Sequence, residues 1–222
     1  MFPKVISYYT ENTAYEEEAK GLIESCKKHE IEYEIESIPN LGSWEENCCY
    51  KPKFIEEKLK ATKNPILWLD ADAVVYRKPK LFERLDADLA IHINPSLPLT
   101  HPSKVSSGTI FINPTKKSFK VLCEWKKEAK KMLADNPSHW DQISLRNVIQ
   151  KVEANIKPLD KSYYAIYTKI ESQQELEQSY FIHFQASRTL KKTINNEVVP
   201  FWDEKAHIKH KKDAFFSKKP LK

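Results

Sequence analysis

The chain has 222 residues, of which 41% are apolar, and this composition supplies enough hydrophobic surface for one sizeable core. It holds only 3 glycines, which excludes the Gly-rich loops that cradle phosphates in dinucleotide-binding and P-loop proteins. The formal net charge of +5 is uneven, because seven lysines and one aspartate fall within residues 205–222. We therefore expect a near-neutral body over residues 1–200 and a basic tail over residues 201–222.

The sequence also bears on location. The N-terminal stretch MFPKVISYYT lacks the layout of a secretory signal, and no apolar run approaches the ~20 residues that span a bilayer. The four cysteines contain no CxxC motif, which favours reduced thiols over a disulfide framework and predicts a cytoplasmic protein. The tail interleaves lysines with Phe215 and Phe216, so it is either a solvated end or a peripheral contact with the anionic inner face of a membrane. No nucleic-acid-binding motif accompanies these charges, and no nucleic-acid partner is expected.

Strand and helix patterns alternate through the first ninety residues. The periodicity predicts a strand at 4–9, a helix at 14–29, a strand at 31–38, a loop at 41–52, a helix at 54–62, a buried apolar strand at 65–69, a short helix at 78–85 and a strand at 89–93. Further elements are predicted as a strand within 106–115, helices at 116–134 and 139–150, and a last strand at 180–184. This alternation favours an α/β fold with a mainly parallel sheet.

The tripeptide Asp-Ala-Asp occurs twice, at residues 70–72 and 86–88. In open α/β sheets, ligands bind at the carboxyl ends of strands, and Asp70 directly follows the apolar run ILWL. Two carboxylates there are suited to a hard divalent cation such as Mn²⁺ or Mg²⁺. Asp86 and Asp88 precede their strand, at the opposite edge of the sheet, where a carboxylate more often closes a turn. We therefore predict that the first pair is the metal site and the second is structural.

The segments YYTENTAY, YKPKF, ILWLDAD, SSGTIFIN, HWDQISL and YFIHF, in that order, resemble the motifs of GT-A-fold nucleotide-diphospho-sugar glycosyltransferases, including the glycogenin-like families. The resemblance covers roughly residues 4–190. It implies a GT-A-like Rossmann-type sandwich with a mainly parallel mixed central sheet, forming a single domain over residues 1–200. It also implies transfer of a sugar from a nucleotide-diphosphate donor, with a UDP-sugar favoured, to an unidentified glycan or lipid-linked saccharide acceptor.

The resemblance assigns roles to individual residues. It implies that Asp70, Asp72 and His183 bind Mn²⁺ or Mg²⁺, and that Asp141 and Gln142 form the catalytic pair. The basic residue expected before the metal-binding strand is Lys51 or Lys53. The residues expected to bind the donor are Tyr9, Thr10, Asn12, Tyr15, Lys51, Asp70, Ala71, Ser107, Gly108 and Arg188.

One part of the pattern departs from the family. A Gly and a Lys often follow the metal-binding His and grip the diphosphate, whereas this chain has Ala186 and Thr189 there, so that Arg188, Lys191 or Lys192 is expected to supply the charge. When the bond from the anomeric carbon to phosphate breaks, negative charge builds on the diphosphate, and a metal ion and basic groups stabilise it. The glycogenin-like families retain the anomeric configuration, and the resemblance implies the same here. If the enzyme instead inverts, Asp141 is the candidate base.

Two alternatives stand beside this interpretation. ILWLDADAV nearly matches the first motif of haloacid-dehalogenase-like phosphatases, in which Asp70 would be the nucleophile. That motif normally lies near the start of a chain, and the later acidic motif of those phosphatases has no counterpart after residue 88. The second alternative is a non-catalytic module that binds a nucleotide or a membrane. Single residues also have structural explanations: His183 as a core histidine, and Asp141 as an acid favoured by a helix N-terminus.

Overall fold

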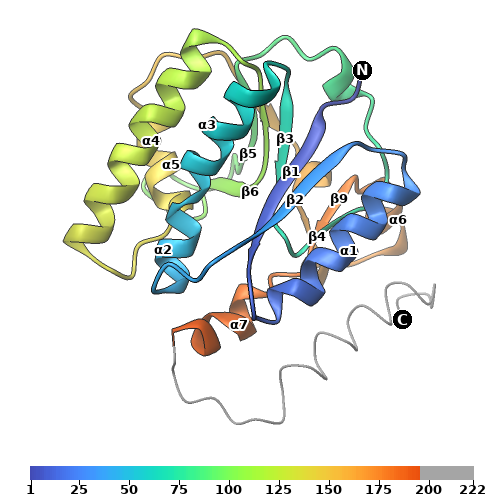
Figure 1. Ribbon diagram of the computed structural model, residues 1–222. Helices are drawn as coiled ribbons and strands as arrows, with labels where there is room; N and C mark the ends of the chain where they lie inside the picture. The colour runs from blue at the N-terminus through green and yellow to red at the C-terminus, as the bar shows by residue number, and fades with distance from the viewer. Residues whose placement is uncertain (196–222) are drawn as a thin grey trace.

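The main sheet has six strands in the order β2-β1-β3-β6-β5-β7 (Figure 1). The strands are β1 (Lys4–Thr10), β2 (Tyr33–Ile38), β3 (Ile66–Leu69), β5 (Leu89–Ile93), β6 (Val105–Ile112) and β7 (Ile156–Leu159). A smaller sheet has the order β4-β9-β8, with β4 (Ala73–Val75), β8 (Ala165–Ile166) and β9 (Phe181–His183). The computed structural model describes residues 1–195, so the predicted basic tail over residues 201–222 lies outside the described residues.

The main sheet is mixed and mainly parallel, as the family resemblance implied. Three pairings are parallel (β1 with β2, β1 with β3, β5 with β7) and two are antiparallel (β3 with β6, β5 with β6). Because β6 runs against β3, the first half of β6 lies beside the carboxyl end of β3, and Leu69 pairs with Thr109. This arrangement brings the residues before Thr109 to the edge at which ligands bind in α/β sheets.

Helices cover both faces of the main sheet. The α-helices are α1 (Tyr15–Lys28), α2 (Trp44–Cys49), α3 (Lys51–Thr62), α4 (Lys116–Asp135), α5 (Asp141–Ile149), α6 (Gln173–Gln178) and α7 (Ser187–Ile194). Single 3₁₀ turns form at η1 (Leu81–Glu83), η2 (Lys161–Tyr164) and η3 (Tyr167–Lys169). Figure 1 shows α3, α4 and α5 on one face of the sheet, with α1 and the small sheet on the other. No helix among residues 1–195 is long and apolar enough to cross a bilayer.

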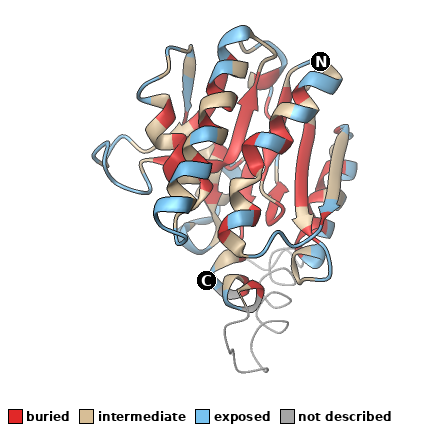
Figure 2. Cartoon of the chain, turned by 60° about the vertical axis from the view of Figure 1, so that its left-hand side comes forward, coloured by how far each residue is buried: buried red, intermediate tan, exposed pale blue. Residues whose placement is uncertain are grey.

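The core follows from the alternation of side chains along the central strands. On β3, Ile66 and Trp68 pack toward α3, α4 and α5, whereas Leu67 and Leu69 pack toward α1 and the small sheet. A strand that is buried on both faces carries apolar residues at successive positions, which explains the uninterrupted run ILWL. Figure 2 shows buried strands between helices whose outer faces are exposed.

The structure corrects several sequence predictions. The predicted loop at 41–52 contains α2, which Ser43 caps by accepting a hydrogen bond from the Glu46 N–H, and it also contains the start of α3. The predicted helix at 78–85 is only the turn η1. The strands β4, β7 and β8 and the helix α6 were not predicted, because each is short and lacks a clear period. The helix α7 was also not predicted, although Leu190 and Ile194 recur at helical spacing.

Candidate active site

The site begins where the chain leaves the main sheet after β3. The Asp70 N–H donates to the Gly108 carbonyl (2.9 Å), and the Ala73 N–H then donates to the Asp70 carbonyl (2.9 Å), which forms a tight turn into β4. In the small sheet, Ala73 pairs with His183. This register places the imidazole beside Asp72, although 111 residues separate the two in sequence (183 − 72).

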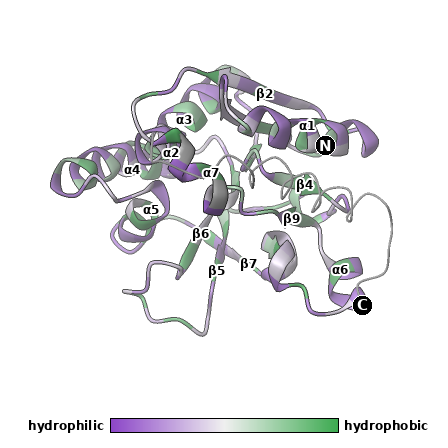
Figure 3. Ribbon diagram, turned by 90° about the horizontal axis from the view of Figure 1, so that it is seen from below, coloured by the Kyte–Doolittle hydropathy of each residue, from purple (hydrophilic) through white to green (hydrophobic). Residues whose placement is uncertain are grey.

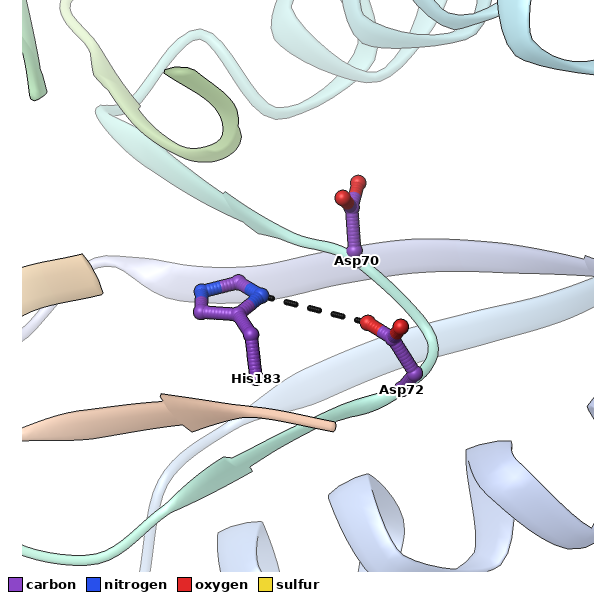
Figure 4. Close-up of side chains that lie close together, drawn as sticks. All are labelled: Asp70, Asp72 and His183. Carbon is purple, nitrogen blue, oxygen red and sulfur yellow. Dashed lines mark ion pairs between the residues drawn. The ribbon is translucent and has the colours of Figure 1, made fainter. Parts of the chain in front are cut away.

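Asp70, Asp72 and His183 each direct one possible metal ligand into a common volume, with these atoms all within 4.8 Å of one another. Figure 4 shows the Asp72 carboxylate and the His183 ring turned toward each other, with 3.9 Å between Asp72 Oδ1 and His183 Nδ1. The other ring nitrogen, Nε2, lies 2.9 Å from the Thr109 hydroxyl, which fixes the orientation of the ring. The Ala186 N–H donates to Asp72 Oδ2 (2.8 Å) and holds that carboxylate.

The two aspartates differ in their electrostatics. Burial raises the pKa of Asp70, and the charge of Lys51 offsets only part of this effect. Burial alone would also raise the pKa of Asp72, but the facing His183 ring and the Ala186 N–H outweigh it, so the pKa of Asp72 is lowered. Asp72 is therefore the more strongly stabilised anion of the pair.

Lys51 connects the cluster to a third carboxylate. Its ammonium lies 2.9 Å from Asp70 Oδ1 and 2.7 Å from Asp141 Oδ2, and it also donates to the Ser107 carbonyl (3.3 Å). Burial would lower the pKa of Lys51, but the charges of Asp141 and Asp70 raise it above its ordinary value. Lys53, the alternative named from the sequence, is 58% exposed on α3 and contacts the Tyr50 ring instead.

The absence of a side chain at Gly108 leaves room for the side chains of Asp70, His183 and Tyr164. A Cβ at this position would lie 2.9 Å from Asp70 Oδ2, 2.9 Å from His183 Cε1 and 2.7 Å from a ring carbon of Tyr164. Any larger residue would therefore displace the side chain of Asp70, His183 or Tyr164. The Tyr164 ring packs against the His183 ring, with 4.5 Å between the ring centroids.

The Asp70–Asp72–His183 cluster, Lys51, Asp141 and Tyr164 line one cleft with a volume of ≈ 850 Å³. Gly108, which the sequence placed at the donor, lies beneath the cluster and does not line the cleft. The residues that were predicted from the sequence and that line this cleft are Tyr9, Thr10, Tyr15, Lys51, Asp70, Ala71, Asp72, Ser107, Asp141, Gln142, His183 and Arg188. Asn12 does not line the cleft: it is exposed in a left-handed turn (φ 58°), and its N–H donates to Glu16 Oε1. The prediction that Asn12 contacts the donor is therefore not supported by its position.

The structure also separates the three cations proposed for the diphosphate. Arg188 lines the cleft. Lys191 forms an ion pair with Glu45 (2.6 Å), and the Glu45 side chain is only 5% exposed. Lys192 is exposed and does not line the cleft. Arg188 is therefore the one of the three with access to a ligand.

Sequence reasoning missed several residues that line the cleft. Trp140 directly precedes Asp141 in the motif HWDQ, so this motif could have predicted that Trp140 lies at the cleft. Tyr164 and Gln185 reach the cleft from η2 and from the turn before α7, and neither carried a sequence signal. Gln142 lines the cleft, and its amide also donates to the Pro102 carbonyl (3.0 Å), which ties α5 to the neighbouring loop.

The second Asp-Ala-Asp has a different environment. Asp88 is buried, and it accepts hydrogen bonds from the Thr115 hydroxyl (2.5 Å) and the Asn155 N–H (2.7 Å). Asp88 thus links the start of α4 to the start of β7, and both of these segments are distant in sequence from Asp88. Asp86 is exposed. The predicted structural role of this pair agrees with these contacts, although the partners of Asp88 are distant rather than local.

A cleft at the carboxyl end of a mixed α/β sheet, with an Asp-x-Asp turn after the central strand, defines a GT-A-like sugar transferase. Residues 38–195 match the family model for nucleotide-diphospho-sugar transferases, and the chain belongs to this family. It is accordingly a nucleotide-sugar-dependent glycosyltransferase, which removes the phosphatase alternative. A search of curated protein sequences finds no match.

Solved structures share the fold at low sequence identity. A glycosyltransferase involved in the glycosylation of the major capsid of PBCV-1 is 14% identical, with a TM-score of 0.64 over 95% of this chain and 100% of that chain. GlyE of Streptococcus pneumoniae TIGR4 is 14% identical, with a TM-score of 0.55 over 99% of this chain and 66% of that chain. The galactosyltransferase LgtC, solved with donor and acceptor sugar analogs, is 11% identical, with a TM-score of 0.51 over 92% and 99%. At these identities the similarity establishes the fold alone.

Proposed function

We propose that this glycosyltransferase uses a divalent cation, Mn²⁺ or Mg²⁺, held by Asp70, Asp72 and His183, and takes its sugar from a UDP-sugar. The observation that carries the proposal is the convergence of these three side chains in a cleft, with ligand atoms within 4.8 Å of one another. Two carboxylates and an imidazole form a donor set suited to Mn²⁺, and to Mg²⁺ when phosphate oxygens complete the shell.

The surroundings of the three side chains fit this assignment. The Thr109 hydroxyl orients the His183 ring, and the Ala186 N–H orients the Asp72 carboxylate, as partners of metal ligands do. Because Gly108 has no Cβ, the side chains of Asp70 and His183 can pack closely against the β6 backbone. A bound cation would supply Lewis-acid stabilisation of the charge that develops on the leaving diphosphate.

The protein's own cations would assist at the same place. Arg188 lines the cleft next to the turn whose Ala186 N–H holds Asp72, so its guanidinium is placed to bind the diphosphate. Lys51 holds Asp70 and Asp141 in one geometry, and a preorganised site of this kind spends little free energy on reorganisation during the reaction. Tyr9, Thr10 and Tyr15 line the part of the cleft formed by β1 and α1, where we place the nucleoside.

Asp141 and Gln142 are proposed to face the transferred sugar and the acceptor. We propose transfer with retention of configuration, in which no carboxylate has to act as nucleophile, and Asp141, held by Lys51, orients the sugar. The proposed acceptor is a glycan or a lipid-linked saccharide. The proposed location is the cytoplasm, with the basic tail over residues 201–222 in contact with the anionic inner face of a membrane.

Binding measurements on the full chain test the donor and metal assignments together. Thermal unfolding is recorded with UDP, GDP, CDP and ADP, each with Mn²⁺ and with a chelator. A nucleotide at ~100 times its dissociation constant stabilises the folded state by about 2.7 kcal/mol. We expect this stabilisation with UDP and Mn²⁺, and its loss with the chelator. Equal stabilisation with and without Mn²⁺ would contradict the metal assignment, and preference for another base would contradict the UDP assignment.

A further inference from the structure

The described residues contain four tryptophans, and they fall into two pairs. Trp68 and Trp125 are at most 2% exposed and belong to the core between the main sheet and α3, α4 and α5. Trp68 also borders the cleft, where its indole N–H donates to Asp70 Oδ1 (2.9 Å). Trp44 and Trp140 are partly exposed, line the cleft and lie outside the three apolar clusters of the described chain. A partly exposed indole that lines a cleft offers an apolar face to a ligand.

Trp44 is fixed before any ligand arrives. Its indole N–H donates to the Tyr15 hydroxyl (3.1 Å), and its backbone N–H donates to Asn195 Oδ1 (2.7 Å). The Lys191 ammonium lies 4.9 Å from the ring centroid and covers one face of the ring. Figure 3 views this region from below and shows α7 beside α2. These contacts leave the indole little conformational entropy to lose when a ligand binds.

Trp140 lies close to Trp44 and also lines the cleft. It is the extended residue directly before α5, so its Cα lies ~3.8 Å from that of Asp141. The Trp140 and Trp44 ring centroids are 6.5 Å apart and their planes meet at 53°. The Trp125 indole N–H donates to the Asp141 carbonyl (2.9 Å), which anchors this end of α5 to the core. The two indoles therefore form an angled aromatic wall beside the Lys51–Asp141 ion pair.

We propose that Trp140 and Trp44 form a subsite for a hexopyranose ring, and this inference rests on the proposed function. A pyranose has a face of C–H groups and a rim of hydroxyls, so it can pack one face on an indole while its rim reaches polar side chains. Asp141 and Gln142 offer polar groups of this kind at the start of α5. A nucleobase stacked between the indoles would need parallel rings, and the 53° angle excludes that arrangement. The ring belongs either to the donor or to the acceptor.

The test compares the full-length wild type with Trp140→Ala, Trp140→Phe and Trp140→Leu. The affinity for UDP with Mn²⁺ reports on the proposed donor site and on folding. The ratio of UDP-glucose or UDP-galactose affinity to UDP affinity reports on the donor sugar. The KM for methyl β-D-glucopyranoside or methyl β-D-galactopyranoside, used as acceptor probes, reports on the acceptor. We expect Trp140→Ala to keep UDP affinity and to lose about 10-fold in one of the two sugar measurements.

The other variants separate stacking from folding. Trp140→Phe retains an aromatic face and should stay within about 3-fold of the wild type in the affected measurement. Trp140→Leu retains apolar bulk without the ring, so it should lose sugar affinity like Trp140→Ala, and it replaces that variant if the alanine change disrupts folding. Wild-type values for the Ala and Leu variants in both sugar measurements would overturn the subsite alone. Failure of the wild type to bind UDP would overturn the proposed function and this inference with it.

Discussion

The Lys51 ammonium lies 2.7 Å from Asp141 Oδ2, and these two side chains are only 6% and 4% exposed. Their contact joins the first turn of α3 to the first turn of α5 across the cleft. Because Lys51 also contacts Asp70, one buried cation links the proposed metal cluster to the residue proposed to face the sugar. Lys51 therefore holds Asp70 and Asp141 in fixed positions relative to each other.

Replacing Lys51 with Met tests that link. The change leaves the buried Asp141 carboxylate and the half-buried Asp70 carboxylate without their cation. Removing one partner of a buried ion pair costs about 3–5 kcal/mol of unfolding free energy. Urea unfolding measures this loss, and nucleotide binding should fail as well. Lys53→Met is the matched control, because Lys53 is 58% exposed on the same helix, and it should change stability by less than about 0.5 kcal/mol. Similar behaviour of the two variants would contradict the special role of Lys51.

Gly108→Ala tests the packing beneath the cluster. The added Cβ would lie 2.9 Å or less from atoms of Asp70, His183 and Tyr164, and overpacking of this kind typically costs about 1–3 kcal/mol. Because two of the three neighbours are proposed metal ligands, we expect Mn²⁺ affinity, measured by calorimetry, to fall together with stability. A variant that is destabilised but binds Mn²⁺ with wild-type affinity would show that the cluster does not need this space.

Glu45 provides a pH-dependent contact between α2 and α7. Burial would raise the pKa of Glu45, but its bonds to Lys191 and Asn195 outweigh this effect, so the pKa is lowered from 4.5. A carboxylate with a lowered folded-state pKa stabilises the protein above its unfolded-state pKa, and this stabilisation is lost as the pH falls through the folded-state value. Glu45→Gln should therefore cost about 1–3 kcal/mol at pH 7 and progressively less below pH 4.5.

Glu46→Gln is the control for that experiment. Glu46 is exposed, and glutamine preserves the reciprocal hydrogen bonding with Ser43 at the start of α2. Unfolding free energies of both variants are measured from pH 3 to pH 7. A cost of Glu45→Gln that stays constant over this range would show that the ion pair with Lys191 does not stabilise the contact.

Asp88→Asn distinguishes the two Asp-Ala-Asp copies. An asparagine keeps one acceptor oxygen, so it loses one of the bonds to Thr115 and Asn155 and should destabilise the protein by about 1–3 kcal/mol. Nucleotide and Mn²⁺ affinities, measured well below the melting temperature, should not change. Loss of Mn²⁺ affinity in this folded variant would contradict a purely structural role for Asp88.

The sequence predicted the parts of the site that follow from strand ends and ordered motifs. An apolar strand that ends at Asp70 identifies the binding edge of the sheet, and the late YFIHF motif correctly pointed to His183 as a neighbour of the aspartates. It did not distinguish Lys51 from Lys53, because that choice depends on which face of α3 is turned to the cleft. Likewise, nothing local indicated that the hydroxyl of Thr109 would meet the ring of His183.

The missed elements have specific physical causes. The six-residue helix α2 has too few turns for a periodic pattern, although Ser43 and Glu46 carry the spacing of a capping box. β7 includes Pro158, which argues against a strand in a sequence-based assignment, and it is tolerated here because β7 is an edge strand of the main sheet. The place of Tyr164 depends on the pairing of β8 with β9, a contact between distant segments.

Turnover of a UDP-sugar by the full chain, with and without Mn²⁺, tests the metal assignment most directly. It is measured in wild type, Asp72→Asn and Asp86→Asn. Asp86 is the matched control, since it belongs to the other Asp-Ala-Asp copy and is exposed. We predict Mn²⁺-dependent turnover in the wild type and in Asp86→Asn, and a loss of about 100-fold or more in Asp72→Asn. Turnover that is unaffected by a chelator, or wild-type turnover in Asp72→Asn, would contradict the assignment of the metal site.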